Sequence, residues 1–353
     1  MRITLPKIIV INGLLAAFLI GLLRCSSISA SEWDKKNKEL IEKYDLKVKL
    51  LAGVPKTTIA SNLEAAKVKS LYSLDSTTLH PGINARFFWG SGSMISVLQV
   101  APNAKIPEEV LPANRFVFVL EGSIEQVIDG KPVTMTSKKR DSPDGTHSST
   151  PRIDFVYLEK GSKNAVTGGP SGAKLLEAYS PLRIDYLQKA GIKNAPAEVA
   201  DIETMQAPNV SPGKVYDLYS FQLTALAPGA NSRLVSGKNI QLSFISMDPN
   251  STFPHHIHPE EQMMFVLRGA CDEILLDGKQ AMKSNDVVRI PGNMVHGAEI
   301  GELGCDALDI FWPARADYLE KEKARMAAYR AIIPGDAPIW RSEERRVGKE
   351  CRS

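Results

Sequence analysis

The sequence is short of the features that define several protein classes. Its 353 residues contain only four cysteines, without the spacing of a disulfide framework or a zinc cluster. Basic and acidic residues nearly balance, at 43 Lys+Arg against 40 Asp+Glu, so the charge does not indicate a nucleic-acid partner. With 43% hydrophobic residues, 25 glycines and 22 prolines, the chain is neither disordered nor collagen-like, and its length allows two domains.

Long hydrophobic runs are also missing, apart from one near the start. Residues 8–23 are mostly apolar and follow Arg2 and Lys7. Because this run is short for a membrane span, we interpret residues 1–30 as a signal peptide rather than a stable membrane anchor, with a retained anchor as the alternative. The protein is therefore expected to be exported, periplasmic or secreted. The charged residues 341–353 contribute no core positions and are interpreted as a non-native tail.

The strongest pattern in the chain is an internal repeat. Several short motifs return 147 residues later. They are Leu71-Tyr72-Ser73 with Leu218-Tyr219-Ser220, Pro81-Gly82 with Pro228-Gly229, and Phe118-Val119-Leu120 with Phe265-Val266-Leu267. A later motif, Pro181-x-Arg183-x-Asp185, recurs as Pro313-x-Arg315-x-Asp317 at the shorter offset of 132. The difference places extra residues in the first copy, within the loop-like stretch 136–152.

Each copy consists of short β-rich runs separated by turn residues. In the second copy these runs are 240–247, 263–267, 273–276 and 287–290. Such spacing predicts a sandwich or a small barrel, so the fold class is mainly β. Helical patterns are confined to 33–51, 185–190 and 315–332, so helices flank the β-rich runs and residues 31–65 form an N-terminal helical segment. A polar linker, 194–214, separates the copies.

Four of the six histidines lie in two short segments of the second copy. His256 and His258 are two residues apart and would face the same side of a strand, whereas His255 would face the other side. Gln262 follows after a bend, and His296 comes from a later strand. Imidazoles and a neutral amide oxygen suit a divalent transition metal. We therefore predict one such ion, Mn, Fe, Ni or Zn, bound by His256, His258, Gln262 and His296.

The first copy lacks a comparable set of ligands. In the repeat register, the four positions hold Glu109, Leu111, Arg115 and Asn164. An apolar side chain and a cation cannot hold a divalent ion. The first domain is therefore expected to be without metal, and either to pack against the second domain or to shape the mouth of its site.

These residues resemble the two sequence motifs of the cupin superfamily, and the duplication resembles a bicupin. The resemblance implies two tandem cupin barrels, each a jelly roll or double-stranded β-helix, at 66–193 and 215–335. The sequence departs from the family pattern at three positions. Gln262 replaces a glutamate, and Asn250 and Asn293 replace glycines.

Downstream of His296, Asp309 and Phe311 lie on one face of a strand, and Arg315 follows. This pattern resembles the small cupins that linearise unsaturated uronates in pectin and alginate breakdown. The resemblance implies that Asp309 shuttles a proton, that Phe311 packs on the sugar, and that Arg315 binds the substrate carboxylate. The metal-less first copy retains Arg183 at the position of Arg315. A structural ion pair is therefore an equal alternative to substrate binding for Arg315.

The leading hypothesis is an exported metal-dependent cupin enzyme that opens a 4,5-unsaturated uronate to a 5-keto sugar. The alternatives are a metal-dependent dioxygenase and a non-catalytic sugar-binding or structural bicupin. The expected partner is a small acidic sugar, and the sequence leaves both a monomer and a homodimer as alternatives. Glu260 and Glu261 are expected at the mouth of the site, with a solvated surface position as the alternative. Cys271 and Cys305 either form a disulfide or are two buried thiols.

Overall fold

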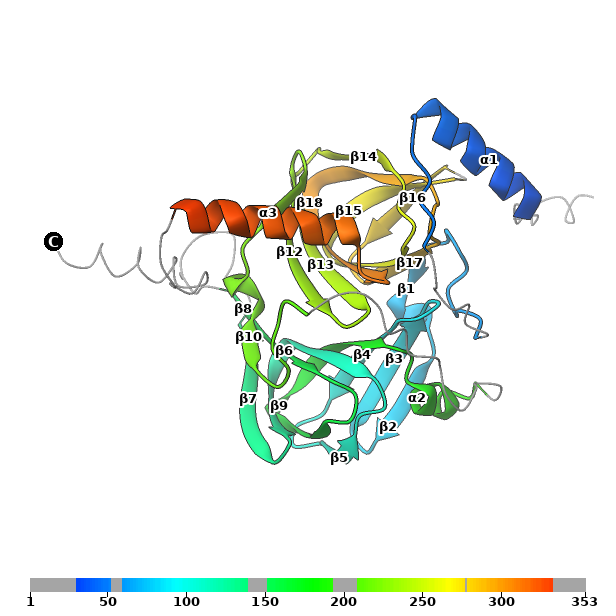
Figure 1. Ribbon diagram of the computed structural model, residues 1–353. Helices are drawn as coiled ribbons and strands as arrows, with labels where there is room; N and C mark the ends of the chain where they lie inside the picture. The colour runs from blue at the N-terminus through cyan, green and yellow to red at the C-terminus, as the bar shows by residue number, and fades with distance from the viewer. Residues whose placement is uncertain (1–29, 52–58, 139–150, 193–207, 277, 333–353) are drawn as a thin grey trace, which may run out of the picture.

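The computed structural model describes residues 30–51, 59–138, 151–192, 208–276 and 278–332 (Figure 1). The predicted signal peptide and C-terminal tail, most of the predicted linker, and most of the extra loop of the first copy lie outside these residues. Within the described ranges, no helix is both long enough and apolar enough to span a membrane.

The N-terminal half folds into one antiparallel sheet that closes into a barrel, drawn at the bottom of Figure 1. Neighbouring strands follow the order β10-β8-β7-β6-β9-β4-β3-β2, and β5 pairs with β9. The strands are β2 (Ser76–His80), β3 (Ile83–Trp89), β4 (Met94–Val100), β5 (Lys105–Val110), β6 (Asn114–Ile128), β7 (Lys131–Lys138), β8 (Arg152–Leu158), β9 (Lys163–Ser180) and β10 (Val215–Asp217).

The C-terminal half repeats this arrangement in a second antiparallel sheet. Its order is β1-β17-β15-β18-β13-β12-β11, with β14 paired to β18 and β16 to β15. The strands are β1 (Lys69–Ser70), β11 (Thr224–Ala227), β12 (Ala230–Gly237), β13 (Ile240–Met247), β14 (Thr252–His256), β15 (Glu261–Leu275), β16 (Gly278–Lys283), β17 (Asp286–Ile290) and β18 (His296–Trp312). The prediction of a mainly β fold with two similar barrels is confirmed.

The helices lie outside the barrels, as the sequence predicts. They are α1 (Ala30–Lys43), α2 (Ile184–Lys189) and α3 (Ala316–Ile332), with short 3-10 turns η1 (Leu71–Ser73) and η2 (Leu218–Ser220). The predicted extension of the first helix to residue 51 is wrong. The helix ends at Lys43, and Asp45 just beyond it adopts a left-handed φ of 50°, a conformation that cannot continue an α-helix.

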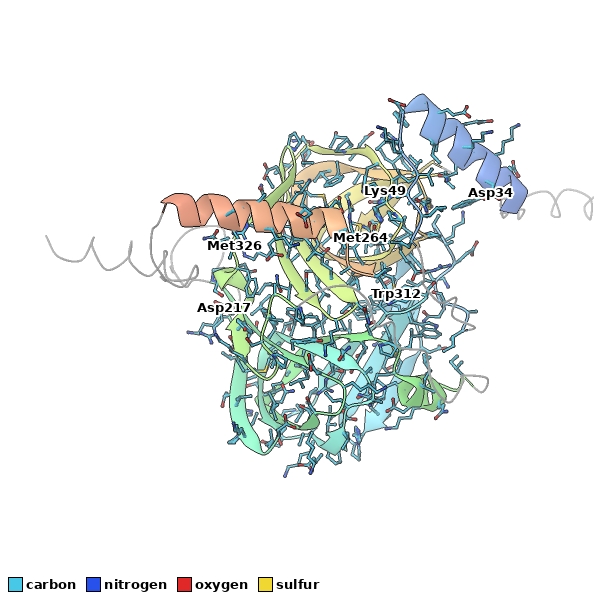
Figure 2. All side chains as sticks on the ribbon, in the orientation of Figure 1. Asp34, Lys49, Asp217, Met264, Trp312 and Met326 are labelled. Atoms are coloured by element: carbon cyan, nitrogen blue, oxygen red, sulfur yellow. The ribbon has the colours of Figure 1, made fainter. Side chains whose placement is uncertain are left out.

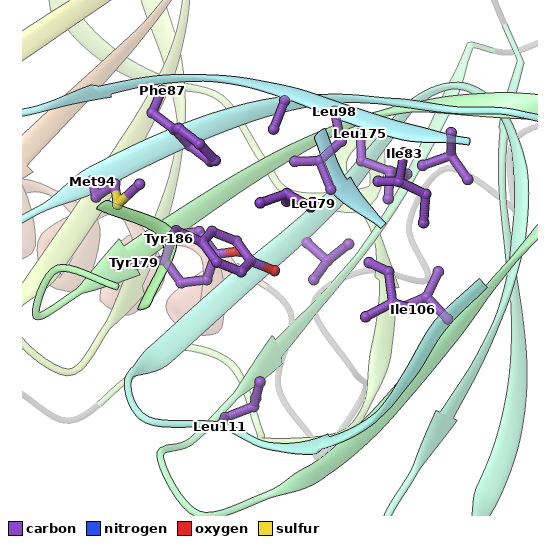
Figure 3. Close-up of a cluster of buried hydrophobic side chains, with 14 of the residues drawn as sticks. Leu79, Ile83, Phe87, Met94, Leu98, Ile106, Leu111, Leu175, Tyr179 and Tyr186 are labelled. Atoms are coloured by element: carbon purple, nitrogen blue, oxygen red, sulfur yellow. The ribbon is translucent and has the colours of Figure 1, made fainter. Parts of the chain in front are cut away.

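Each barrel encloses its own hydrophobic core because apolar residues alternate along the strands. In the N-terminal barrel the core includes Ile83, Phe87, Leu98 and Leu175, which point toward one another in Figure 3. The C-terminal barrel has a separate core that includes Val288 of β17. The apolar residues on the inner faces of the strands therefore give each barrel its own core.

A third core cluster joins the two barrels. Phe118 of β6 packs on Phe244 of β13 with ring centroids 4.9 Å apart, and Phe88 of β3 faces Phe265 of β15 at 6.1 Å. Full burial of one such side chain is worth about 1.5–3 kcal/mol. The N-terminal barrel therefore packs against the C-terminal one.

Short strands are exchanged between the barrels. β1 precedes the N-terminal barrel in the sequence but pairs with β17 of the C-terminal sheet, Lys69 opposite Val287. Likewise, β10 precedes the C-terminal barrel but pairs with β8 of the N-terminal sheet, Tyr216 opposite Phe155. The sequence did not predict this reciprocal exchange, which links each barrel covalently and by hydrogen bonds to the other.

The loop between β3 and β4 also reaches the C-terminal barrel. Glu261 accepts hydrogen bonds from the Ser91 backbone N–H at 2.5 Å and from Arg289 at 2.9 Å. A Cβ on Gly92 would lie only 1.8 Å from the ring of Trp312, which Figure 2 places between the barrels. The expectation that Glu261 lies at the mouth of the metal site is therefore wrong. Its carboxylate is buried at the interface between the barrels, where it binds the backbone of the loop between β3 and β4.

Candidate metal centre

Three strands, β14, β15 and β18, and one connecting loop carry the predicted ligands. His256 ends β14 and His296 begins β18, and the two residues are direct partners in the sheet. His258 follows β14 in the connecting loop, and Gln262 is the second residue of β15. The potential ligand atoms of His256, His258 and His296 all lie within 4.8 Å of one another. The fold therefore brings together residues that are up to forty positions apart.

The histidine tautomers are fixed by backbone carbonyls. Nδ1 of His256 lies 3.0 Å from the Pro254 oxygen, and Nδ1 of His296 lies 2.8 Å from the Met294 oxygen. Nδ1 of His258 lies 2.9 Å from its carbonyl partner two residues along. Because a carbonyl can only accept, each Nδ1 carries the proton and each Nε2 presents a lone pair.

Gln262 adds a fourth lone pair at the same point. Its Oε1 lies 3.1 Å from Nε2 of His258 and 3.2 Å from Nε2 of His296. Its Nε2 donates to Oδ1 of Asp309 at 2.9 Å, which turns the amide oxygen toward the histidines. Acceptors that face one another without a proton between them repel, unless a cation lies among them. The donor set therefore fits a divalent transition metal held by three imidazoles and one amide oxygen.

Burial keeps the three imidazoles neutral. It lowers the pKa of His256 to about 3, and the charges of His258 and Arg315 act in the same direction. Burial also holds the pKa values of His258 and His296 well below their usual range. Neutral imidazole is the form that binds metals, so the site is in its binding form at neutral pH.

The other two histidines that the structure describes take no part in this cluster. The ring of His255 stacks on Tyr44, with centroids 4.2 Å apart, and so faces away from His256 as the alternation predicts. His80 lies on β2 of the other barrel, and His147 lies outside the described residues.

A pocket of about 360 Å³, its open mouth included, adjoins the histidines. Its polar lining includes His256, Gln262, Glu273, His296, Asp309 and Tyr318. Its apolar lining includes Ile245, Met247, Phe253, Met264 and Phe311. All of these residues belong to the C-terminal half, so no described residue of the N-terminal barrel lines this pocket.

Asp309 and Phe311 lie beside the predicted ligands. Burial raises the pKa of Asp309 to about 7, although the hydrogen bond from Gln262 and the charge of Arg315 oppose the shift. Phe311 meets the edge of the His258 ring at a centroid distance of 5.4 Å. The structure thus places a carboxyl group that is partly protonated at neutral pH at the pocket wall.

Glu273 is a pocket residue that the sequence reasoning missed. It is buried, and burial together with the charges of Asp309 and Cys305 raises its pKa well above the usual range. Cys271, Glu273 and Leu275 alternate along β15 and are all buried. This period of two would have identified Glu273 as an inward-facing acid.

Arg315 packs behind the pocket rather than in its lining. Its Nε and Nη2 bind both carboxylate oxygens of Asp317, at 2.9 and 2.6 Å, and its guanidinium carbon lies 3.7 Å from the centre of the Tyr318 ring. The first barrel contains the same unit, since Arg183 binds Asp185 and stacks on a tyrosine. The geometry therefore supports a structural ion pair between Asp317 and the edge of the Arg315 guanidinium formed by Nε and Nη2. Its Nη1 is buried without a partner among the described residues.

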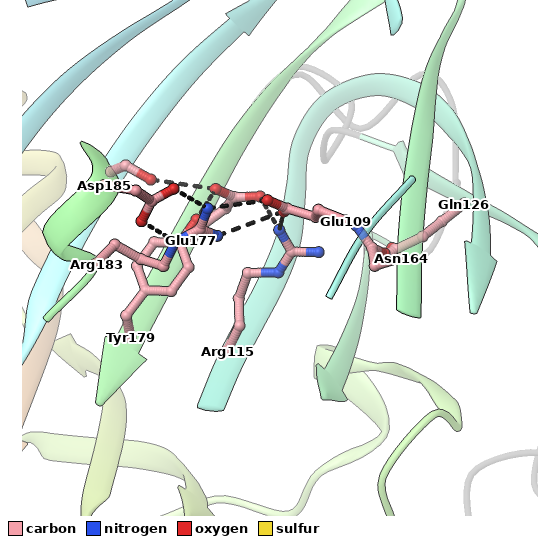
Figure 4. Close-up of polar contacts among 9 residues, drawn as sticks. Glu109, Arg115, Gln126, Asn164, Glu177, Tyr179, Arg183 and Asp185 are labelled. Carbon is pink, nitrogen blue, oxygen red and sulfur yellow. Dashed lines mark hydrogen bonds and ion pairs between the residues drawn. The ribbon is translucent and has the colours of Figure 1, made fainter. Parts of the chain in front are cut away.

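The N-terminal barrel fills the corresponding place with its own charges (Figure 4). Arg115, at the position of Gln262, contacts Glu109 at 3.3 Å and Glu177 at 3.6 Å. Glu109 is also bound by Arg183 at 2.9 Å. The side chains of Gln126 and Asn164 bond to each other at 2.5 Å. An internal guanidinium thus occupies the neighbourhood that a cation would need.

Other polar residues near the centre have structural contacts. Oε2 of Glu260 lies 3.7 Å from Nδ1 of His258, and burial raises the pKa of this glutamate. Glu260 is therefore buried against a ligand rather than solvated. Cys271 and Cys305 are free, buried thiols, and the pKa of Cys271 is raised by its hydrogen bond to Cys305 and by burial.

Comparison with known proteins identifies this half of the chain. Residues 243–311 match the family described as cupin domain. The C-terminal barrel has the cupin fold. No curated protein sequence matches the chain.

One solved structure extends the likeness in fold to both barrels. A variant of oxalate decarboxylase from Bacillus subtilis matches with a TM-score of 0.50 and 15% identity, over 74% of this chain and 79% of that one. AerE from Microcystis aeruginosa matches with a TM-score of 0.49 and 13% identity, over 67% of this chain and 96% of that one. The architecture of this protein is thus that of a bicupin, with one histidine triad in its C-terminal cupin.

Proposed function

We propose that the C-terminal cupin binds one divalent transition metal and acts as an enzyme on a small acidic sugar. The specific reaction proposed is the opening of a 4,5-unsaturated uronate to a 5-keto sugar. The observation that carries the metal site is the convergence of four unprotonated acceptors, three from imidazole and one from Gln262. A bound metal would supply Lewis acidity and polarise the oxygens of the substrate.

Asp309 supports the proton transfer that this reaction requires. Ring opening yields an enol, and the 5-keto sugar forms once carbon 4 gains a proton. With a pKa of about 7, Asp309 can both hold and release a proton at neutral pH. Its Oδ1 accepts from Gln262, and its Oδ2 makes no hydrogen bond with the described residues. Oδ2 is therefore the atom proposed to exchange the proton with the substrate.

The N-terminal barrel supports an acidic ligand by internal analogy. There Glu109 stands at the place of His256, and its carboxylate is bound by the free edge of Arg183. In the C-terminal cupin the neutral His256 replaces that carboxylate, and Nη1 of Arg315 has no partner among the described residues. Phe311 and Tyr318 line the pocket and pack on the Arg315 guanidinium, so a ligand carboxylate would satisfy this buried donor once one of the two rings moves aside. Phe311 would pack against the sugar ring.

The test combines metal analysis with a spectroscopic assay. The purified protein is analysed for bound metal and is then incubated with unsaturated galacturonate, whose conjugated ultraviolet absorbance is lost on ring opening. We expect about one metal per chain and faster loss of absorbance than with the His256→Ala, His258→Ala double variant. Equal rates for both proteins would refute the ring-opening reaction.

The remaining outcomes distinguish the alternatives. Bound metal without turnover of this substrate would favour another metal-dependent reaction. Iron content with oxygen consumption would identify a dioxygenase. A protein that binds no metal would be a non-catalytic sugar-binding or structural bicupin.

We also propose that the protein is exported to the periplasm or the medium. This proposal depends on the apolar segment at residues 8–23. Mass spectrometry of the protein from culture fractions would show a mature chain beginning near residue 30. Recovery of the full-length chain from the cytoplasm would contradict export.

A further inference from the structure

The start of the described chain lies on the C-terminal cupin rather than on the barrel that follows it in sequence. We call residues 30–51, which comprise α1 and the segment after it, the N-terminal strap (Figure 1). Trp33 and Leu40 of the strap pack against the core of the C-terminal cupin. This places the strap beside the loops that carry the predicted metal ligands.

Asn37 of the strap clamps the turn before His296. Its Nδ2 donates to the backbone oxygen of Asn293 at 2.8 Å, and its Oδ1 accepts from the backbone N–H of Val295 at 2.9 Å. Asn37 is only 8% exposed, although it sits on a helix that is otherwise largely open to solvent. Both polar atoms of one buried amide thus hold the residues on either side of Met294.

The clamped turn in turn holds two ligands. The Met294 oxygen accepts the Nδ1 proton of His296, which sets the orientation of that ring. The backbone N–H of Asn293 donates to the backbone oxygen of His258 at 2.7 Å. A shift of the turn would therefore displace His296 and loosen His258 together.

The strap also contacts the strand of the third ligand. Tyr44 stacks on His255 with an interplanar angle of 14° and a centroid distance of 4.2 Å. His255 immediately precedes His256 in β14. The strap therefore contacts β14, which carries His256, and the turn that leads into β18, which begins at His296.

We propose that the N-terminal strap is a positioning element of the metal centre and that Asn37 is its positioning residue. Asn37 acts through the turn 293–295, whose carbonyl and N–H groups hold His296 and His258. The inference rests on the metal site proposed above and adds that the site is complete only with a segment more than two hundred residues away in sequence. Outer groups that orient metal ligands typically affect affinity about 10-fold to 100-fold.

The experiment compares Asn37→Ala with Asn62→Ala in the full chain. Asn62 makes the same kind of clamp on the metal-less barrel, since its amide bonds the Phe87 oxygen at 2.8 Å and the Trp89 N–H at 3.2 Å. Co²⁺ affinity is measured by titration, together with the visible spectrum of the bound ion. We expect Asn37→Ala to weaken affinity about 10-fold or more and to change the spectrum, and Asn62→Ala to leave both unchanged.

Each outcome decides a different point. Wild-type affinity and spectrum in Asn37→Ala would overturn the role of the strap and leave the metal site standing, as would an equal loss in both variants. A wild-type chain that binds no Co²⁺ would overturn the metal site and the strap's role with it. If Asn37→Ala does not fold, the isosteric Asn37→Asp provides the test. It keeps the bond from Val295 but sets a carboxylate oxygen against the Asn293 carbonyl oxygen, so a Co²⁺ affinity below that of the wild type is expected, and wild-type affinity would overturn the role of the strap.

Discussion

At the scale of single residues, Asp309 has two roles that can be separated. It orients the Gln262 amide by accepting its N–H, and it carries the proton proposed for the reaction. Asn at this position keeps an acceptor oxygen but has no acidic proton, whereas Ala removes both functions. We therefore expect Asp309→Asn to keep metal affinity and lose turnover, and Asp309→Ala to lose about 10-fold or more in affinity as well. Calorimetric titration with the metal and the ultraviolet assay measure the two effects.

The two variants also provide each other's control. If Asp309→Ala binds metal as tightly as Asp309→Asn, the hydrogen bond to Gln262 does not orient the ligand. If Asp309→Asn keeps full turnover, another group supplies the proton.

Glu273 makes stability depend on pH. Its folded-state pKa lies well above the usual value, chiefly because of burial. Stability from the protonated form is therefore fully present below about pH 4, near the pKa of an unfolded glutamate, and is lost as pH rises through the folded pKa. Glu273→Gln cannot lose a proton, and Gln126 already occupies the matching position in the first barrel.

The prediction for Glu273→Gln follows from that sign. In the presence of a chelator, the variant should have a higher melting temperature than the wild type at pH 8 and nearly the same one at pH 4. At this domain size each kcal/mol corresponds to about 2–4 °C. Melting curves of both proteins at pH 4 and pH 8 test this prediction. If the difference in melting temperature between variant and wild type is the same at both pH values, ionisation of Glu273 does not destabilise the folded protein.

The residues that the sequence identified are those with a local pattern. The metal site could be predicted from the spacing of His256, His258 and Gln262, because few other patterns place such donors together. Asn250 and Asn293 replace family glycines without loss because their φ values, 58° and 60°, lie in the left-handed region that asparagine tolerates. The ion-pair partner of Arg315 could not be predicted from the sequence, because only the three-dimensional contact shows that Asp317 occupies one edge of the guanidinium.

At the scale of elements, the loop between β3 and β4 fixes how the barrels meet. A Cβ on Gly92 would overlap the Trp312 ring, so Gly92→Ala must separate the barrels locally or displace the indole. Overpacking of this kind costs about 1–3 kcal/mol. We expect a loss of that size in urea unfolding.

Gly301→Ala is the matched control for Gly92→Ala. Gly301 lies in the exposed middle of β18, where an added Cβ meets no atom closer than 3.6 Å. Its substitution should change stability by less than about 0.5 kcal/mol. Equal effects of the two substitutions would show that the loop contact does not hold the barrels together.

Strand positions inside the barrels were partly predictable from β-rich runs between turn residues. The strand β13 spans the indicated residues 240–247, whereas the predicted runs 263–267 and 273–276 belong to the single strand β15. The exchanged strands β1 and β10 were not predictable. They have two and three residues, too few for any periodicity, and their partners lie on the other barrel. Pairing over such separations depends on the assembled tertiary structure rather than on local pattern.

At the scale of the whole molecule, the exchanged strands and the shared aromatic cluster predict one cooperative unit. Neither barrel can unfold without breaking the pairing of β1 or β10 and exposing Phe118 and Phe244. A ligand that binds only the folded C-terminal cupin should therefore stabilise the N-terminal barrel too. At a free metal concentration of 100 times the Kd, the added stability is about 2.7 kcal/mol.

Hydrogen exchange can test this coupling strand by strand. On addition of metal, we expect the slowest amides of β6 in the N-terminal barrel to exchange about 100-fold more slowly, as much as those of β15, because both exchange through global unfolding. The His256→Ala, His258→Ala variant should show no slowing in either strand. Protection that rises in β15 alone would mean that the barrels unfold separately and that the strand exchange does not couple them.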